Sequence, residues 1–262
     1  MHLYRTRRGE GEPLLLIMGM AGHHRMWGEP FLTLLERDFD VVAFDHRGIG
    51  TSARADAPFT IADLADDAAQ VLDTVGWARA HVFGISLGGM VAQEFALRHP
   101  DRLRTLTLGC TYPGLGGDLS ATGAQRALEA SSSGDEERAV RAMYEVNVSA
   151  RHAADPANYD VFRREALSVQ VPVPVVMMQF QAVLGHDALN RLATITAPTL
   201  VIHGTEDEML AAANGKQIAS VIPDAHLELF EGTGHLFWWE EPERTATLLR
   251  DHAATVMRRK RP

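Results

Sequence analysis

The sequence predicts an α/β fold with a mostly parallel central sheet, flanked by helices and interrupted by a helical insertion. Short apolar runs alternate with amphipathic helical segments over the first hundred residues, and the same alternation resumes after Pro198. Between them, residues 114–194 contain helical stretches but no convincing central strand. Alternation of strand and helix is typical of βαβ units and a parallel sheet. Ligand chemistry in such a sheet belongs at the carboxyl ends of the strands.

The first half of the sheet is expected to contain four buried strands, because four short apolar runs are closed by Gly, Asp or polar loops. Thr60 is a suitable N-cap for one of the helices between them, and Pro100 stops another. The strands are Leu14–Ile17, Val41–Phe44, Ala80–Ile85 and Arg104–Leu108, and the helices are Glu29–Arg37, Thr60–Val75 and Leu87–Arg98.

Helices are expected in the insertion near residues 120–130, 135–150, 158–168 and 175–192. The apolar run 169–176 is not a central strand, because Pro172 and Pro174 cannot donate to a ladder. After the insertion we expect strands at Thr199–His203 and His226–Phe230, and helices at Ala213–Val221 and Pro242–Met257.

Composition describes an ordinary globular chain of 262 residues with 46% hydrophobic residues and a net charge of −9. These values exclude global disorder, a collagen helix and a disulfide scaffold. The acidic balance argues against nucleic acid or an anionic membrane as partner, and we expect the basic tail Arg258–Arg261 to be solvated. The single Cys110 excludes an intrachain disulfide and a CxxC motif. No signal peptide is recognisable, so a cytoplasmic location is expected.

The strongest chemical signal is Gly84-Ile85-Ser86-Leu87-Gly88, between a predicted strand and a predicted helix. A GxSxG sequence in that context is the pattern of a nucleophile elbow. The residues two before and two after the serine crowd together, so both must be glycine, and Ser86 is lifted clear of the sheet. The alternative is a glycine-rich turn whose serine merely caps the helix.

A serine nucleophile needs a base, and twelve histidines compete for that role. His235 is preferred because it follows the last strand in the loop GTGH. His23 and His24 follow the first glycine loop and could line a pocket. The other histidines considered lie in or beside predicted elements and are read as structural: His46, His81, His99, His203 and His226.

The orienting acid is expected in the loop Gly204–Glu208, which follows the next-to-last strand. The GxxD spacing favours Asp207, whereas Glu206 and Glu208 are read as solvated loop charges. The other position for an acid is the end of the strand after the nucleophile helix, where residues 109–112 contain no carboxylate.

Acyl transfer also needs donors for the oxyanion. The backbone N–H of Leu87 follows the nucleophile directly. The loop Met18–Gly22 is glycine-rich, and its Met20 N–H is the expected second donor. The alternative for this loop is a plain turn that closes the first strand.

The chain resembles the α/β-hydrolase-fold serine hydrolases over nearly its full length. The segments that carry the resemblance are LLLIMGMAG, FDHRGIGTS, GISLGG, PTLVIHGTED and GTGHLFWWEEPE, in the family's order. It implies Ser86, Asp207 and His235 as the triad, and Met20 and Leu87 as oxyanion donors. It also implies a core of residues 1–112 and 195–262, with a helical cap, 113–194, inserted after the sixth strand.

Within that family the chain most resembles small bacterial esterases and lactonases of the 3-oxoadipate enol-lactonase type. One departure concerns the oxyanion loop, because many members have His-Gly where this chain has Met18-Gly19. The donor there is a backbone group, so catalysis should survive, but the hydrogen bonding behind the loop must differ.

Substrate contacts are expected from the cap and from the loop after the catalytic histidine. Met177, Met178, Phe180 and Val183 fall at helical spacing, which is equally compatible with an apolar acyl pocket and with a helix core. Phe237 is likewise compatible with either a pocket or a core position, and His24 is a further candidate for a substrate contact. No metal-binding or nucleotide-binding pattern occurs, so neither a metal nor another cofactor is expected.

These features predict a cofactor-free serine hydrolase that cleaves a small carboxylic ester or lactone through an acyl-enzyme on Ser86. The same triad serves carbon–carbon bond hydrolases and cofactor-free perhydrolases, and a receptor that retains the triad is a further alternative. Dehalogenases and epoxide hydrolases are disfavoured, because those members have Asp at the position of Ser86.

Overall fold

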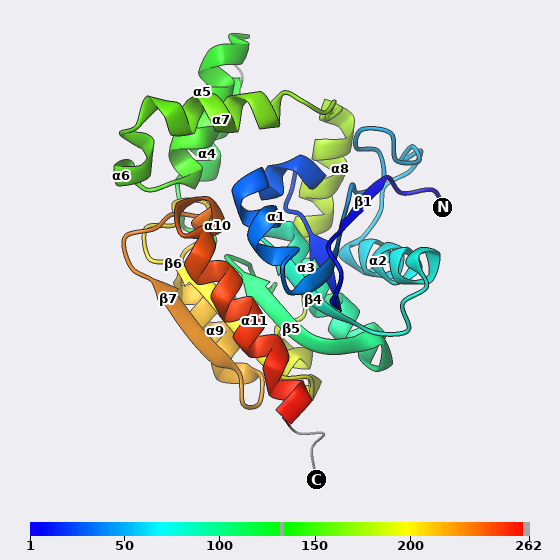
Figure 1. Ribbon diagram of the computed structural model, residues 1–262. Helices are drawn as coiled ribbons and strands as arrows, with labels where there is room; N and C mark the ends of the chain where they lie inside the picture. The colour runs from blue at the N-terminus through cyan, green and yellow to red at the C-terminus, as the bar shows by residue number, and fades with distance from the viewer. Residues whose placement is uncertain (132–133, 259–262) are drawn as a thin grey trace.

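The computed structural model describes residues 1–131 and 134–258. Across these residues the core is one seven-stranded sheet with the order β1-β3-β2-β4-β5-β6-β7 (Figure 1). β1 is antiparallel to β3, and every other neighbouring pair is parallel, so the predicted α/β architecture is confirmed. The strands are β1 (Arg5–Arg8), β2 (Glu12–Ile17), β3 (Phe39–Phe44), β4 (Ala80–Ile85), β5 (Leu103–Gly109), β6 (Thr199–Gly204) and β7 (His226–Phe230).

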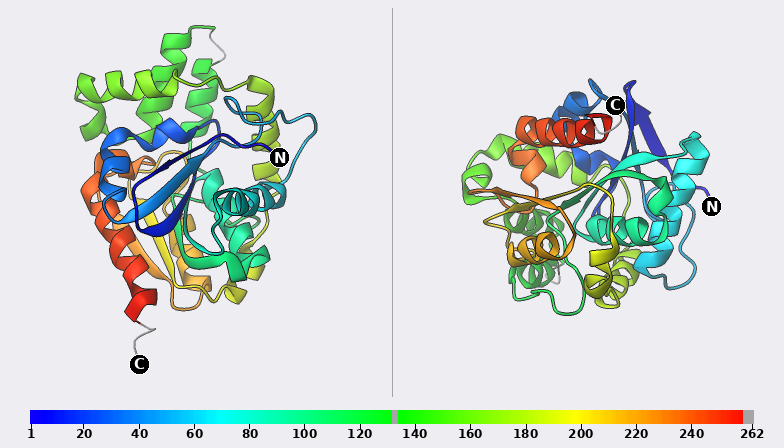
Figure 2. Two further views of the ribbon diagram at one scale, coloured as in Figure 1. Left: turned by 45° about the vertical axis from the view of Figure 1, so that its right-hand side comes forward. Right: turned by 90° about the horizontal axis from the view of Figure 1, so that it is seen from below.

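Helices cover both faces of the sheet (Figure 2). Successive strand residues point to opposite faces, so Leu15 and Ile17 belong to one apolar cluster and Leu14 and Leu16 to the other. The first cluster lies beneath α2 (Ile61–Val75), α3 (Leu87–Arg98) and α9 (Ala213–Val221). The second lies beneath α1 (Glu29–Leu35), α10 (Phe237–Glu240) and α11 (Pro242–Arg258). The short 3-10 helices η1 (His24–Trp27) and η2 (Pro100–Arg102) precede α1 and β5, respectively.

The helical insertion lies between β5 and β6. It contains α4 (Gly123–Ser131), α5 (Glu136–Asn147), α6 (Ala150–Ala153), α7 (Pro156–Ala166), α8 (Val173–Leu184) and the 3-10 helix η3 (Leu189–Thr194). Helices α4 to α8 gather at one end of the sheet, whereas η3 leads into β6 (Figure 1). The expected position after a sixth strand is wrong for this chain, because the N-terminal segment supplies a single antiparallel strand and only five strands precede the insertion.

The edge strand β1 has no counterpart among the predicted strands. Its sequence, RTRR, has no apolar alternation, because the strand lies at the sheet edge and exposes charged side chains. Two of the three arginines are paired: Arg7 binds Asp40, and Arg8 binds Glu29 and Glu36. Pairing with β3 and with both ends of α1 therefore holds this segment.

Local signals located several of the other elements, but the single helix expected near residues 175–192 is divided, because α8 ends at Leu184 before Gly185 and η3 begins at Leu189. β4 and α3 have the predicted bounds, and Thr60 forms a capping box with Asp63 at the start of α2. Pro172 and Pro174 stand at the beginning of α8, where the missing N–H groups cost nothing. Positions 259–261 of the predicted basic tail lie outside the described residues.

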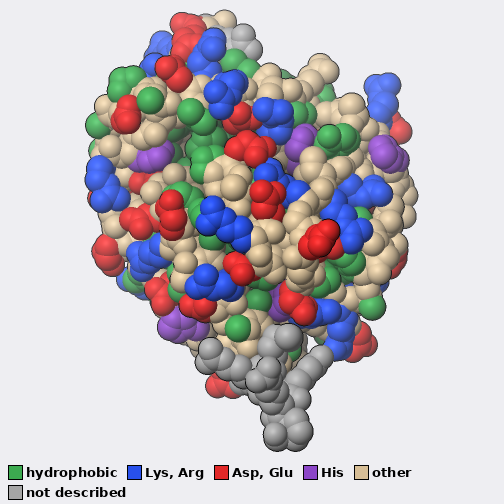
Figure 3. Space-filling view, viewed as in Figure 1, with side chains coloured by type: hydrophobic (Ala, Val, Ile, Leu, Met, Phe, Trp, Pro, Cys, Tyr) green, Lys and Arg blue, Asp and Glu red, His purple; other side chains and the backbone are tan. Residues whose placement is uncertain are grey.

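Charged side chains of both signs are interspersed over the face seen in Figure 3. In residues 1–131 and 134–258, no helix is both long enough and apolar enough to cross a bilayer.

Candidate active site

The candidate site lies where four neighbouring parallel strands end. Ser86 follows β4, Cys110 follows β5, the loop 205–208 follows β6, and His235 lies in the loop after β7. Backbone hydrogen bonds join these strand ends: Ser86 N–H donates to Gly109 O (2.9 Å), and Cys110 N–H to Ile202 O (2.9 Å). The sheet order therefore brings together residues that are up to 149 positions apart in the chain.

The turn at Ser86 has the geometry of a nucleophile elbow. Ser86 has φ 54° and ψ −124°, a conformation that non-glycine residues rarely adopt, and it makes no side-chain capping bond to α3. A Cβ atom on Gly84 would lie 2.1 Å from Gly88 O, and one on Gly88 would lie 2.0 Å from Ile17 O. Glycine is therefore required on both sides. The alternative of a serine that merely caps the helix does not fit these contacts.

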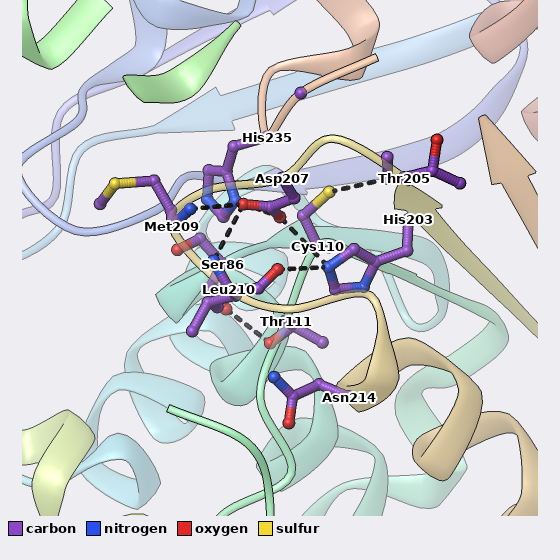
Figure 4. Close-up of polar contacts among 12 residues, drawn as sticks. Ser86, Cys110, Thr111, His203, Thr205, Asp207, Met209, Leu210, Asn214 and His235 are labelled. Carbon is purple, nitrogen blue, oxygen red and sulfur yellow. Dashed lines mark hydrogen bonds and ion pairs between the residues drawn. The ribbon is translucent and has the colours of Figure 1, made fainter. Parts of the chain in front are cut away.

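The structure joins His235 to Asp207 rather than to either neighbouring glutamate. His235 Nδ1 lies 2.7 Å from Asp207 Oδ2, and both side chains are almost fully buried (Figure 4). Glu206 and Glu208 are exposed, and Glu208 forms an ion pair with Arg126. Because a carboxylate only accepts hydrogen bonds, Nδ1 of His235 must carry the proton, which leaves Nε2 of the neutral ring free to act as a base.

Asp207 is held by four donors. Its Oδ1 accepts the N–H groups of Met209 (2.8 Å) and Leu210 (2.9 Å), and its Oδ2 accepts from His235 and from His203 (3.1 Å). Burial by itself raises the pKa of the Asp207 carboxyl, but the charge of His235 and the hydrogen bonds from His203 and His235 outweigh it. The pKa of Asp207 is therefore held well below its usual range, and the side chain stays ionised.

His203, whose position in the sequence indicated a structural role, lies in contact with the acid. Its Nε2 lies 3.1 Å from Asp207 Oδ2 and 2.9 Å from Leu210 O, so this nitrogen faces two acceptors and must be the protonated one. The spacing of four residues from His203 to Asp207 was the available signal. It was weak, because a strand end and the following loop have no fixed periodicity.

Cys110 lies beside the acid but is not prepared for metal binding. Its Sγ accepts a long hydrogen bond from Gly204 N–H (3.5 Å), and one donor atom each of Cys110, Asp207 and His235 fall within 4.8 Å of one another. Burial and the nearby charge of Asp207 raise the pKa of the thiol well above its ordinary value. A protonated thiol is a poor metal ligand, and the Asp207 oxygens already accept four hydrogen bonds.

The loop Met18–Gly22 runs beside the nucleophile. A Cβ atom on Gly19 would lie 3.1 Å from Ser86 Cβ, a tighter contact than most Cβ atoms make, so the backbone of this loop passes close to the serine. Behind the loop, His46 Nε2 donates to Met18 O (2.9 Å), which shows how hydrogen bonding is arranged in a chain with Met18-Gly19 instead of His-Gly. Met20 and Leu87, the expected oxyanion donors, thus belong to segments that flank Ser86.

The four candidate pocket residues of α8 fall on different sides of the helix. Met178 and Val183 are half-buried against the apolar cluster that includes Leu87. Met177 is 53% exposed and Phe180 44% exposed, so these two side chains are open to solvent, and their contact with a substrate stays a prediction. Since α8 is apolar nearly all round, its sequence does not indicate which face is buried.

The two other residues considered for substrate binding, Phe237 and His24, both contact protein side chains. Phe237 is fully buried and packs on the rings of Phe83 and Phe230, so it belongs to the core of the sheet. His24 is bound through Nδ1 to Asp45 (2.9 Å) and packs on Tyr4. The contacts found for both residues therefore support the structural interpretation.

The fold agrees with comparison to known proteins. Residues 12–242 match the family described as the alpha/beta hydrolase fold. The chain belongs to that family. This alpha/beta hydrolase is 32% identical over 238 residues to a protein of Azorhizobium caulinodans named "Putative carbamate hydrolase RutD", with 90% of this chain and 88% of the relative covered.

Two solved structures are similar along almost the whole chain. One is Est816, described as an N-acyl homoserine lactone degrading enzyme, with 30% identity, a TM-score of 0.76 and coverage of 95% of this chain and 96% of that one. The other is a thermophilic esterase from Thermogutta terrifontis, with 25% identity, a TM-score of 0.81 and coverage of 97% and 93%. These relatives support a hydrolytic function for the alpha/beta hydrolase described here.

Proposed function

We propose that this alpha/beta hydrolase is a serine hydrolase that cleaves a small carboxylic ester or lactone. The observation that carries the proposal is the Asp207–His235 hydrogen bond of 2.7 Å at the same strand ends as a serine held at φ 54°. An orienting acid, a base and a nucleophile at one sheet edge are the parts that acyl transfer requires. The esterase and lactone-degrading relatives support the choice of substrate class.

In the first half-reaction, Ser86 Oγ attacks the carbonyl carbon while His235 Nε2 takes the hydroxyl proton. The tetrahedral oxyanion accepts hydrogen bonds from the N–H groups of Met20 and Leu87. Collapse breaks the bond to the leaving alkoxide, which receives the proton from His235. For a lactone, this alkoxide remains attached as the other end of the acyl chain.

In the second half-reaction, water attacks the acyl-enzyme and gives one proton to His235. Collapse then breaks the bond to Ser86 Oγ, which recovers that proton, and the carboxylic acid is released. Asp207 remains ionised throughout, because its depressed pKa keeps it a carboxylate facing the imidazolium.

We infer that the substrate is mainly apolar. The half-buried side chains of Met20, Met178 and Val183 all pack against the apolar cluster that contains Leu87. We assign Met178 and Val183, of the four residues first considered on α8, to the substrate side. Methionine fills irregular space well, which suits acyl chains of different shapes.

Turnover of p-nitrophenyl butanoate tests the proposal. Wild type should pass through many catalytic cycles, and Ser86→Ala should lose on the order of 10⁵–10⁶ in kcat. The matched control is Ser220→Ala, because Ser220 is an exposed serine on α9. A small organophosphate should label the wild-type peptide that contains Ser86 and should not label Ser86→Ala.

The same assay separates the alternatives. A single slow cycle would indicate a receptor rather than an enzyme. Retention of a tenth of the wild-type activity by Ser86→Ala would overturn the role of Ser86. A panel of lactones, carbamates and ring-cleavage products would then compare ester hydrolysis with carbamate and carbon–carbon bond cleavage on one scale of kcat/KM.

A further inference from the structure

Gln179 is a fully buried polar residue on α8 that reaches the oxyanion loop from the insertion. Its Oε1 accepts the N–H of Ala21 at 2.9 Å, across 158 positions of sequence. Ala21 has a positive φ of 57°, and it follows Met20 directly. The side chain of Gln179 therefore ends at the backbone that is expected to bind the oxyanion.

The orientation of this amide follows from its partner. A backbone N–H can only donate, so the atom that faces Ala21 must be the carbonyl oxygen of Gln179. The two N–H donors of Nε2 then point elsewhere, and within the described part of the chain this buried nitrogen has no hydrogen-bond partner. Leaving a buried donor unpaired costs about 1–3 kcal/mol, so such a group in a native structure needs an explanation.

The position of Nε2 suggests what that partner is. Nε2 and Oε1 are attached to the same carbon atom, and Oε1 accepts a hydrogen bond from the N–H of Ala21, the residue after Met20. Gly19 of the same loop runs beside Ser86. The Gln179 amide therefore lies against the loop whose Met20 N–H is expected to bind the substrate carbonyl oxygen.

We propose that Gln179 is a specificity-determining residue whose Nε2 donates to a second acceptor oxygen of the substrate. The proposal rests on the proposed ester or lactone hydrolysis and narrows its substrate class. Preferred substrates carry an ether, ketone or amide oxygen a few bonds from the scissile carbonyl, and the remainder is apolar to suit Met20, Met178 and Val183. With such an oxygen bound, the buried donor of Gln179 is satisfied.

Pairs of p-nitrophenyl esters of matched shape test this proposal. Methoxyacetate differs from butanoate by an oxygen in place of a methylene, and levulinate differs from isocaproate by a ketone oxygen in place of a methyl branch. For each pair, the ratio of kcat/KM is divided by the ratio of the alkaline hydrolysis rates, which removes intrinsic reactivity. In wild type this corrected ratio should favour at least one oxygen-bearing ester by about tenfold or more.

Two variants separate the role of the Nε2 donor from that of the hydrogen bond between Gln179 Oε1 and the Ala21 N–H. Gln179→Glu keeps an oxygen for the Ala21 N–H but has no N–H donors, and Gln179→Met removes both. The corrected ratio should fall about tenfold in each, and butanoate turnover should fall further in Gln179→Met. The matched control is Gln181→Met, because Gln181 is exposed on the same helix, and its ratio should equal that of wild type.

Each outcome has a defined meaning. A corrected wild-type ratio near one for both pairs overturns the proposal without any variant, even if the Gln179 variants fail to fold. A preference that persists in both variants overturns it as well. Absence of ester turnover by wild type would instead refute the proposed function, and the assignment of Gln179 would fall with it.

Discussion

Asp207→Asn is the substitution that most sharply tests the hydrogen bonding of the site, because every group around this carboxylate is a donor. Asn can place its oxygen toward Met209 and Leu210, whose N–H groups lie 2.8 and 2.9 Å from Oδ1. Its NH₂ group then faces the protonated nitrogens of His235 and His203. If the amide is flipped, its NH₂ group instead faces the N–H groups of Met209 and Leu210, which are also donors.

The expected rate loss follows from the ring of His235. To accept from the new NH₂ group, Nδ1 must lose its proton, and the neutral ring then carries the proton on Nε2, where the serine proton has to go. In the serine protease triad the same change costs about 10⁴ in kcat. We expect a loss of that order here, and much smaller losses for Glu206→Gln and Glu208→Gln, whose side chains are exposed.

Stability should change with a definite pH dependence. Two hydrogen bonds to a charged group are lost, at about 1.5–3 kcal/mol each, and relief of the buried charge offsets part of this. The folded pKa of Asp207 lies below its unfolded value of 3.8, so its contribution is complete above about pH 4 and is lost as the pH falls further. The difference in unfolding free energy between wild type and Asp207→Asn should therefore shrink below pH 4.

Kinetics with p-nitrophenyl butanoate and urea unfolding at several pH values measure both effects. Near-normal kcat in Asp207→Asn, or a larger loss in Glu206→Gln, would refute the assignment of the acid. A stability difference that grows as the pH drops below 4 would refute the sign of the linkage.

Three further predictions concern packing and protonation. Gly88→Ala should unfold at much lower urea than Gly185→Ala, because its Cβ would lie 2.0 Å from a carbonyl oxygen, whereas the nearest atom at Gly185 is 3.6 Å away; equal midpoints would contradict the packing at the elbow. Phe180→Ala should change the unfolding free energy by about 0.5 kcal/mol or less, but Val175→Ala by about 1–3 kcal/mol, since Val175 is buried; the reverse order would mean that α8 is turned about its axis. Burial lowers the pKa of His81 to about 4 from 6.5, so between these pH values the protein takes up a proton when it unfolds, and the free energy of unfolding falls as the pH drops. His81→Gln should reduce the slope of unfolding free energy against pH by about 1.4 kcal/mol per pH unit in this range. An unchanged slope would show that His81 is not buried in its neutral form.

The parts of the fold that local chemistry determines could be predicted from the sequence. The bounds of β4 and α3 follow from an apolar run, a glycine-flanked turn and Pro100, and the start of α2 follows from Thr60. β1 could not be recognised, because a charged edge strand owes its conformation to pairing with β3 and to partners such as Asp40.

The residues of the site also fall into those that local sequence indicates and those that depend on tertiary contacts. The motif around Ser86 and the GxxD spacing of Asp207 are local, and the acid and base chosen from them lie 2.7 Å apart. The contacts of His203 with Asp207 and of Gln179 with Ala21 depend on how a loop folds back and on how the insertion is placed. Neither arrangement leaves a periodic trace in the sequence, so both side chains had to be found in three dimensions.

The attachment of the insertion has a consequence for how such an enzyme can evolve. Its two ends meet, since Ala188 N–H donates to Pro113 O at 3.0 Å, and β5 and β6 on either side of it are neighbours in the sheet. The sheet therefore requires only that a segment inserted here span the short distance between the end of β5 and the start of β6. The entropic cost of closing such a loop rises only slowly with its length. Natural variation can exchange or resize this segment, including Gln179, while the strand ends that hold Ser86, Asp207 and His235 keep their register.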